Sequence, residues 1–76
     1  METNLYVGNL PPDATDGDLR SLFSLFGTVL RVRVVTGLGF GFVEMDGGAG
    51  EAARTLDGAP VRGHVLAVRE ATAPWA

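Results

Sequence analysis

Residues 39–45, which read Gly-Phe-Gly-Phe-Val-Glu-Met, constrain the fold of this chain more than any other segment. In a β-strand, successive side chains point to opposite faces. Val43 and Met45 then share one face with two glycines, which suits a core that a helix can approach closely. Phe40 and Phe42 share the opposite face. The pattern predicts a strand that is buried on one side and carries aromatic rings on the other.

A second segment, residues 4–10, has the same alternation. Leu5 and Val7 match a buried face, and Tyr6 falls on the opposite one. Two prolines then end the segment. If both strands belong to one sheet, three aromatic rings share a face. Exposed apolar surface of this kind usually marks a binding site.

Two stretches with helical spacing separate the predicted strands. In the first, a capping box of Thr15 and Asp18 precedes apolar residues at i, i+3, i+4 and i+7, and Gly27 is expected as a left-handed C-cap. That apolar stripe consists of Leu19, Leu22, Phe23 and Phe26. The second, weaker stretch has apolar residues at helical spacing, and Asp57-Gly58 closes it. Glycines surround its start, so we expect this helix to begin late and to fray. Its apolar positions are Ala49, Ala52, Ala53 and Leu56.

Residues 29–35 and 64–69 predict two further strands. The resulting order is strand, helix, strand, strand, helix, strand. This order is typical of an α+β, ferredoxin-like βαββαβ fold, with a four-stranded antiparallel sheet and both helices packed on one face. We therefore expect one domain over residues 1–76, with a core of about 4–71 and a short C-terminal tail, 72–76.

Residues 39–43 resemble the octapeptide ribonucleoprotein motif of the RNA recognition motif family. Residues 5–10 resemble the companion hexapeptide on the first strand of that family. With the matching order of elements, the resemblance covers residues 4–71, and it is closest to the compact single-domain bacterial members. It implies that single-stranded RNA binds on the helix-free face, with a base stacked on Tyr6 and on Phe42. Phe40 would lie against the sugars between them.

The charge of the chain departs from that of a typical RNA-binding protein. Nine acidic residues face six arginines, and the net charge is −3. Because phosphate contacts supply much of the affinity for nucleic acids, we expect modest affinity. By alternation Arg31, Arg33 and Arg69 share the aromatic face with Glu44 as its one acid, so this face is expected to be locally positive.

The family motif departs at Leu38, which replaces its leading Lys or Arg, and the turn at Thr36-Gly37 is shorter than the basic loop common in the family. The predicted RNA-binding residues are Tyr6, Phe40, Phe42, Arg33, Arg31, Arg69, Asn4 and Leu38. The acidic balance and Leu38 leave an alternative open, a protein–protein interaction domain that uses the same face.

No catalytic constellation is visible, and His64 has no evident co-ligands, so we expect neither enzyme activity nor a metal or other cofactor. The chain has no cysteine, no apolar run of membrane-spanning length and no secretory signal pattern. We expect a monomeric, cytoplasmic protein that binds single-stranded RNA, with single-stranded DNA or a protein as further partners and no membrane partner. Trp75 is expected in the tail, from which it could stack on the sheet.

Overall fold

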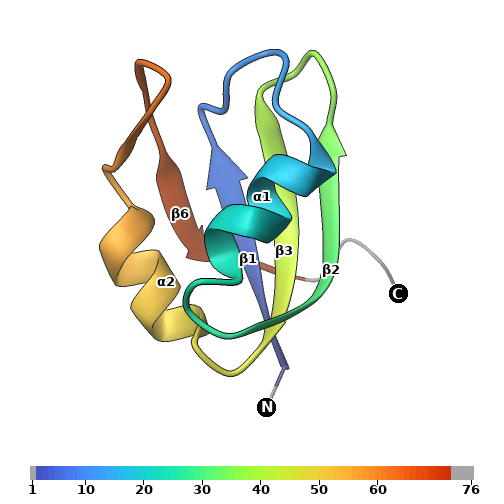
Figure 1. Ribbon diagram of the computed structural model, residues 1–76, viewed down its shortest axis with the longest axis vertical. Coiled ribbons are helices and arrows are strands. Elements are labelled where there is room, and N and C mark those ends of the chain that lie inside the picture. Colours follow the sequence, from blue (N-terminus) through green and yellow to red (C-terminus); the bar gives the residue numbers. More distant parts are fainter. Residues whose placement is uncertain (1, 73–76) are drawn as a thin grey trace.

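The computed structural model describes residues 2–72. Over these residues the chain forms a four-stranded antiparallel sheet in the order β2-β3-β1-β6, with two helices on one face (Figure 1). The elements in chain order are β1 (Glu2–Gly8), α1 (Asp16–Phe23), β2 (Thr28–Val35), β3 (Phe40–Asp46), α2 (Ala49–Leu56), β4 (Pro60–Val61), β5 (His64–Val65) and β6 (Ala67–Glu70). The predicted ferredoxin-like fold is confirmed. Neither helix of the described part is long and apolar enough to span a membrane.

The core lies between the sheet and the helices, on the side that strand alternation predicts. The fully buried residues that β1 and β3 contribute are Leu5, Val7, Val43 and Met45. Gly41 is buried among them, and a Cβ there would lie 3.2 Å from Cδ1 of Leu19 in α1. Because no side chain stands at Gly41, α1 packs directly against the middle of β3.

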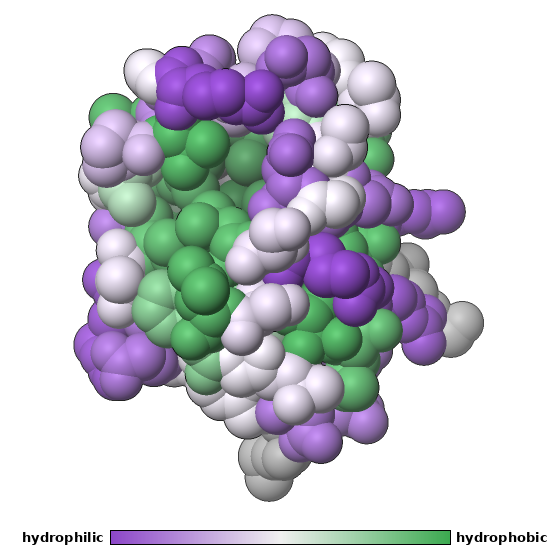
Figure 2. Space-filling view, viewed as in Figure 1, coloured by the Kyte–Doolittle hydropathy of each residue, from purple (hydrophilic) through white to green (hydrophobic). Residues whose placement is uncertain are grey.

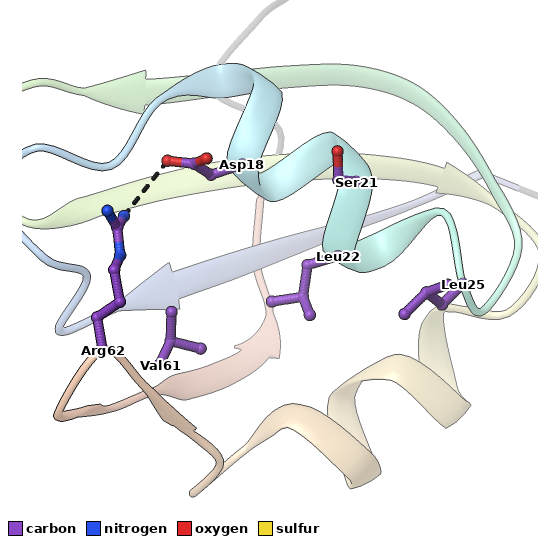
Figure 3. A pocket seen from close by; sticks show the side chains of 6 residues that line it. All are labelled: Asp18, Ser21, Leu22, Leu25, Val61 and Arg62. Atoms are coloured by element: carbon purple, nitrogen blue, oxygen red, sulfur yellow. Dashed lines mark hydrogen bonds and ion pairs between the residues drawn. The ribbon is translucent and has the colours of Figure 1, made fainter.

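The predicted capping box begins α1. Oγ1 of Thr15 accepts a hydrogen bond from the N–H of Asp18 (3.2 Å), and Oδ2 of Asp18 accepts one from the N–H of Thr15 (2.9 Å). Nη2 of Arg62 lies 3.4 Å from the same carboxylate (Figure 3). The hydrogen bond from the Thr15 N–H is the largest cause that holds the pKa of Asp18 below its usual value of 3.8, and Arg62 adds to it.

The prediction that Gly27 caps α1 is wrong. The helix ends at Phe23, and its C-cap is Ser24 in a right-handed conformation. Gly27 instead allows the loop after α1 to approach the loop before α2. A Cβ on Gly27 would collide with the carbonyl oxygen of Gly47. In the same contact, a Cβ on Gly48 would collide with the carbonyl oxygen of Phe26. This glycine is needed for a backbone contact rather than for a positive φ.

The single last strand predicted over residues 64–69 is also wrong. β4 and β5 pair with each other as a short hairpin, and only β6 joins the main sheet, beside β1. Arg62 and Gly63 form the turn of this hairpin with φ of 47° and 83°. Positive φ at both central residues is the geometry of tight hairpin turns. The turn was not predicted because its sequence is Arg-Gly, whereas Asn-Gly or Asp-Gly is the usual signature of such a turn.

Each outer strand of the sheet has a backbone N–H bound by a carboxylate from a helix end. Oδ1 of Asp16, in the first turn of α1, accepts from the N–H of Val34 in β2 (2.8 Å). Oδ1 of Asp57, the C-cap of α2, accepts from the N–H of Val68 in β6 (3.0 Å). These two hydrogen bonds attach the helices to the two opposite edges of the sheet.

Candidate nucleic-acid interface

Tyr6, Phe40 and Phe42 form a triangle on the sheet face opposite the helices, and we call this triangle the aromatic platform. The ring centroids of Tyr6 and Phe40 are 6.0 Å apart with the rings inclined by 27°. Phe42 stands edge-on to both, at 5.9 Å from Tyr6 and 6.0 Å from Phe40. All three side chains are partly exposed. The predicted face of the three rings is confirmed, and their contacts with one another fix their orientations.

The strand register places the platform in rows that cross the sheet. In an antiparallel pair, residues directly opposite each other have their side chains on the same face. One row consists of Arg33, Phe42, Tyr6 and Arg69, from β2, β3, β1 and β6 in turn. The two central rings of this row therefore lie between two arginines.

Gly8 gives the Tyr6 ring its room, a feature that the sequence analysis did not single out. A Cβ on Gly8 would lie 2.6 Å from Oη and 2.8 Å from Cε2 of Tyr6. Residues two apart in a strand point to the same face, so a side chain at Gly8 would occupy the place of the ring. Phe40 is the partner of Gly8 in β3, which explains how the Tyr6 ring reaches Phe40. The signal in the sequence that could have identified Gly8 is its position two residues after Tyr6 in the same strand.

Arg69 lies over Tyr6. Its Cζ is 5.1 Å from the centroid of the Tyr6 ring, within the range of a cation–π interaction. Arg33, at the other end of the row, is exposed and makes no ion pair within residues 2–72. The two arginines of the row thus differ, because one is placed on an aromatic ring and the other is available to an anion.

Arg31 lies in the next row, opposite Glu44. Its Nε is 3.6 Å from Oε1 of Glu44, whose side chain is only 13% exposed. Asn4 completes this row, and its Oδ1 is buried and accepts no hydrogen bond from the described residues. The predicted site residues Arg31 and Asn4 are therefore on the right face. The charge of Arg31 is balanced there by Glu44, and the Asn4 acceptor is covered.

The expectation that Glu44 is the one acid on this face is wrong. Glu2 and Asp46 are opposite each other one row beyond Asn4 and Glu44, and both are exposed. Within the described residues the face therefore carries three arginines and three carboxylates. The charges are separated along the strands, with arginines beside the aromatic platform and carboxylates toward the start of β1. The positive character is confined to the platform end.

Leu38, the predicted site residue that replaces the motif's leading cation, lies in the turn that joins β2 to β3. β3 begins at Phe40, which is opposite Val35, so the connection is four residues long. Gly37 and Gly39 have φ of 85° and 75°, and these left-handed positions end the strand pattern. Leu38 is 70% exposed between them.

A hollow lies on the helix side of the molecule, between α1 and the β4–β5 hairpin (Figure 3). Leu22, Leu25 and Val61 line it, with the ion pair of Asp18 and Arg62 at one end. Figure 2 shows that apolar surface gathers on this helix-covered side. Within residues 2–72, no three histidine or carboxylate side chains gather as a metal site would require. Trp75 and the rest of the predicted tail beyond residue 72 lie outside the described residues.

Comparisons with known proteins place the chain in a family. The family model for the RNA recognition motif matches residues 5–67. RbpE of Nostoc sp. is 45% identical over an alignment that covers 90% of this chain and 77% of that relative. The crystal structure of RNA binding protein PG1 superposes with a TM-score of 0.87 at 38% identity, covering 91% of this chain and 93% of PG1. The SXL-lethal protein/RNA complex superposes with a TM-score of 0.83 at 34% identity, covering 91% of this chain and 47% of that one.

The chain belongs to the RNA recognition motif family, as its resemblance indicated. Its fold and its aromatic sheet face define an RNA-binding domain.

Proposed function

We propose that this domain binds single-stranded RNA by stacking bases on the aromatic platform. The observation that carries the proposal is the row of two rings, Phe42 and Tyr6, between two arginines on a face that the helices leave uncovered. Stacking of a base on an aromatic side chain contributes about 1–3 kcal/mol and tolerates any base. Two stacked bases therefore provide most of the binding free energy of a small site.

The path of the RNA backbone follows from the charge distribution. Arg33 and Arg69 flank the platform, whereas Glu2 and Asp46 repel phosphates at the other end of β1. Two phosphate contacts on a single strand correspond to a slope of about −1.4 for log K against log[salt]. We expect micromolar affinity with this shallow salt dependence, because stacking rather than charge dominates the binding.

The proposed role is binding without catalysis, by a monomeric, cytoplasmic domain. The face consists of aromatic rings and balanced charges, which hold a ligand but do not activate a nucleophile. Single-stranded DNA is a weaker ligand in this proposal, since the 2′-hydroxyl is the group that distinguishes RNA at a given site. The single-domain extent of residues 1–76 belongs to the same proposal.

An amide NMR titration with a mixed pool of single-stranded RNA tests the proposal. We expect shifts to concentrate at Tyr6, Phe40, Phe42 and Arg33, and Phe42→Ala to remove them. Leu25→Ala is the matched control, because Leu25 is 79% exposed and lies on the helix side. The spectrum of each free variant reports whether the fold is intact. An absence of shifts at millimolar RNA and low salt contradicts the proposal.

A second candidate is the docking of a protein segment on the same face. The balance of three arginines and three carboxylates, together with exposed Leu38, favours it. Binding of an apolar peptide in competition with RNA, and without salt dependence, would distinguish this function from the first.

A further inference from the structure

A pocket adjoins the aromatic platform at the loop end of the sheet. It lies where Tyr6 and Phe40 meet the loop after β1 and the turn between β2 and β3, and its volume is about 420 Å³. The other side chains that line it are Asn9, Leu10, Pro12 and Leu38. We call it the loop-end pocket. Its position makes it continuous with the surface on which the proposed function stacks bases.

The two loops that enclose the loop-end pocket are joined to each other. The N–H of Leu10 donates a hydrogen bond of 2.7 Å to the carbonyl oxygen of Gly39. A Cβ on Gly39 would lie 3.1 Å from the carbonyl oxygen of Leu10, and Gly39 has a φ of 75°. Only a glycine allows this close approach in this conformation. The pocket is therefore formed before any ligand arrives, which lowers the entropic cost of binding.

The apolar part of the lining suits a flat ring. Leu38 is 70% exposed although it is a large aliphatic residue, and Pro12 is exposed as well. Together with the rings of Tyr6 and Phe40 they provide the apolar surface of the pocket. Leu38 stands where the family motif has Lys or Arg. This end of the sheet therefore lacks a cation for a phosphate and offers apolar surface for a base.

The polar part of the lining comes from Asn9, which adopts a φ of 60°. Its Nδ2 donates a hydrogen bond of 2.8 Å to the carbonyl oxygen of Val65, and this bond fixes which amide atom is the nitrogen. Oδ1 is then the acceptor that remains, and in the described part of the chain nothing donates to it. An acceptor beside the apolar side chains of this pocket matches the exocyclic amino group of adenine, cytosine or guanine.

We propose that the loop-end pocket takes one further nucleobase of the bound RNA, with a preference for an amino-bearing base over uracil. This proposal rests on the proposed function, because the base reaches the pocket from a strand that is stacked on the platform. Leu38 and Pro12 contact the faces of the base, and Oδ1 of Asn9 accepts a hydrogen bond from its amino group.

Affinity measurements with two exposed leucines test the apolar contact. Leu38→Ala removes a wall of the pocket, and Leu25→Ala removes a leucine of similar exposure from the helix side. We expect Leu38→Ala to weaken the binding of a cytidine-containing oligouridylate about tenfold, the loss of one base contact, and Leu25→Ala to leave it unchanged. Equal affinities for wild type and Leu38→Ala overturn the proposal.

Base preference tests the polar contact. Wild type is expected to bind oligouridylate with one central cytidine several-fold more tightly than pure oligouridylate. Asn9→Gly accepts the left-handed backbone without the amide, and it is expected to remove this difference. A preference that persists in Asn9→Gly, or its absence from wild type, overturns the assignment of Oδ1.

NMR of the Leu38 methyl groups separates the pocket from the platform. A base beside Leu38 shifts these methyl resonances upfield through its ring current. If Phe42 signals shift to saturation while the Leu38 methyls do not move, the pocket proposal fails and the proposed function stands. If neither responds at millimolar RNA, both fail.

Discussion

The guanidinium carbon of Arg69 lies 5.1 Å from the centre of the Tyr6 ring, and the two residues are direct partners across β1 and β6. The contact holds the cation at the platform before RNA binds. It also means that one ring face of Tyr6 is occupied in the free domain. A base that stacks there either displaces the guanidinium or binds beside it, since a planar cation also stacks on bases.

Arg69→Gln is expected to weaken RNA binding several-fold and to reduce the salt slope by about 0.7, the value for one contact on a single strand. Arg54→Gln on α2 removes the same charge from the helix side, where Arg54 is 73% exposed and paired with Glu51. Its effect on Kd should be small. Titrations at several salt concentrations measure both quantities. Equal effects of the two variants would show that Arg69 acts only through net charge.

Gly8→Ala is expected to weaken RNA binding about tenfold, because its Cβ would stand 2.6 Å from Oη of Tyr6 and displace the ring. The loss of one stacked base corresponds to this factor. The Tyr6→Ala background provides the control, since Gly8→Ala should cost little there. A double-mutant cycle of Kd values measures the coupling. Additive effects of the two substitutions would contradict a role through the ring.

Gly50→Ala is expected to stabilise the domain, since Gly50 is exposed in α2, has no positive φ and offers a Cβ only an ordinary contact with Arg54. Replacing a helical glycine by alanine contributes up to about 1 kcal/mol. For a domain of this size that corresponds to a rise in Tm of about 4–8 °C. Gly48→Ala is the contrasting variant, with a φ of 80° and a collision with the carbonyl oxygen of Phe26, and its Tm should fall.

Asp18 is expected to contribute to the pH dependence of stability. Its pKa is lowered in the folded state, chiefly by the hydrogen bond from the Thr15 N–H. The contribution is therefore present above the unfolded pKa, near 3.8, and is lost as the pH falls through the lower folded pKa. Urea midpoints from pH 7 to pH 2 should fall less steeply for Asp18→Asn than for wild type.

Asp13→Asn is the matched control for that experiment. Asp13 pairs with the same arginine, Arg62, at 3.5 Å, but its side chain is 78% exposed. Its pH profile should follow that of wild type. If Asp13→Asn and Asp18→Asn flatten the profile equally, the cause is Arg62 rather than the capping box.

The aromatic platform was predictable because the two-residue period is strict in a paired strand. Once Leu5 and Val43 are assigned to the core, the faces of Tyr6 and Phe42 follow without further information. The acids at the far end of the same face were not predicted. β1 begins at Glu2, ahead of the predicted start, and β3 continues beyond the predicted end, so the carboxylates there belong to the sheet.

Features that depend on two distant segments were beyond sequence reasoning. The hairpin of β4 and β5 has strands of two residues, too short to show any period. The role of Gly27 depends on where the loop before α2 passes, which no local pattern records. The loop-end pocket likewise exists because the N–H of Leu10 meets the carbonyl of Gly39, 29 residues later in the chain. The sequence motif singles out Leu38, but it does not show which residues lie beside Leu38 in the pocket.

The carboxylates of Asp16 and Asp57 bind N–H groups on the outer strands β2 and β6. An open strand edge is a template on which a second chain can add its own strand, and natural proteins block it in several ways. Here the blocking groups belong to the helix ends, so the barrier persists only while the helices stay docked. Loss of either carboxylate by substitution would uncover a backbone N–H at one edge of the sheet, where a second chain could add its own strand, without touching the face that carries the aromatic platform.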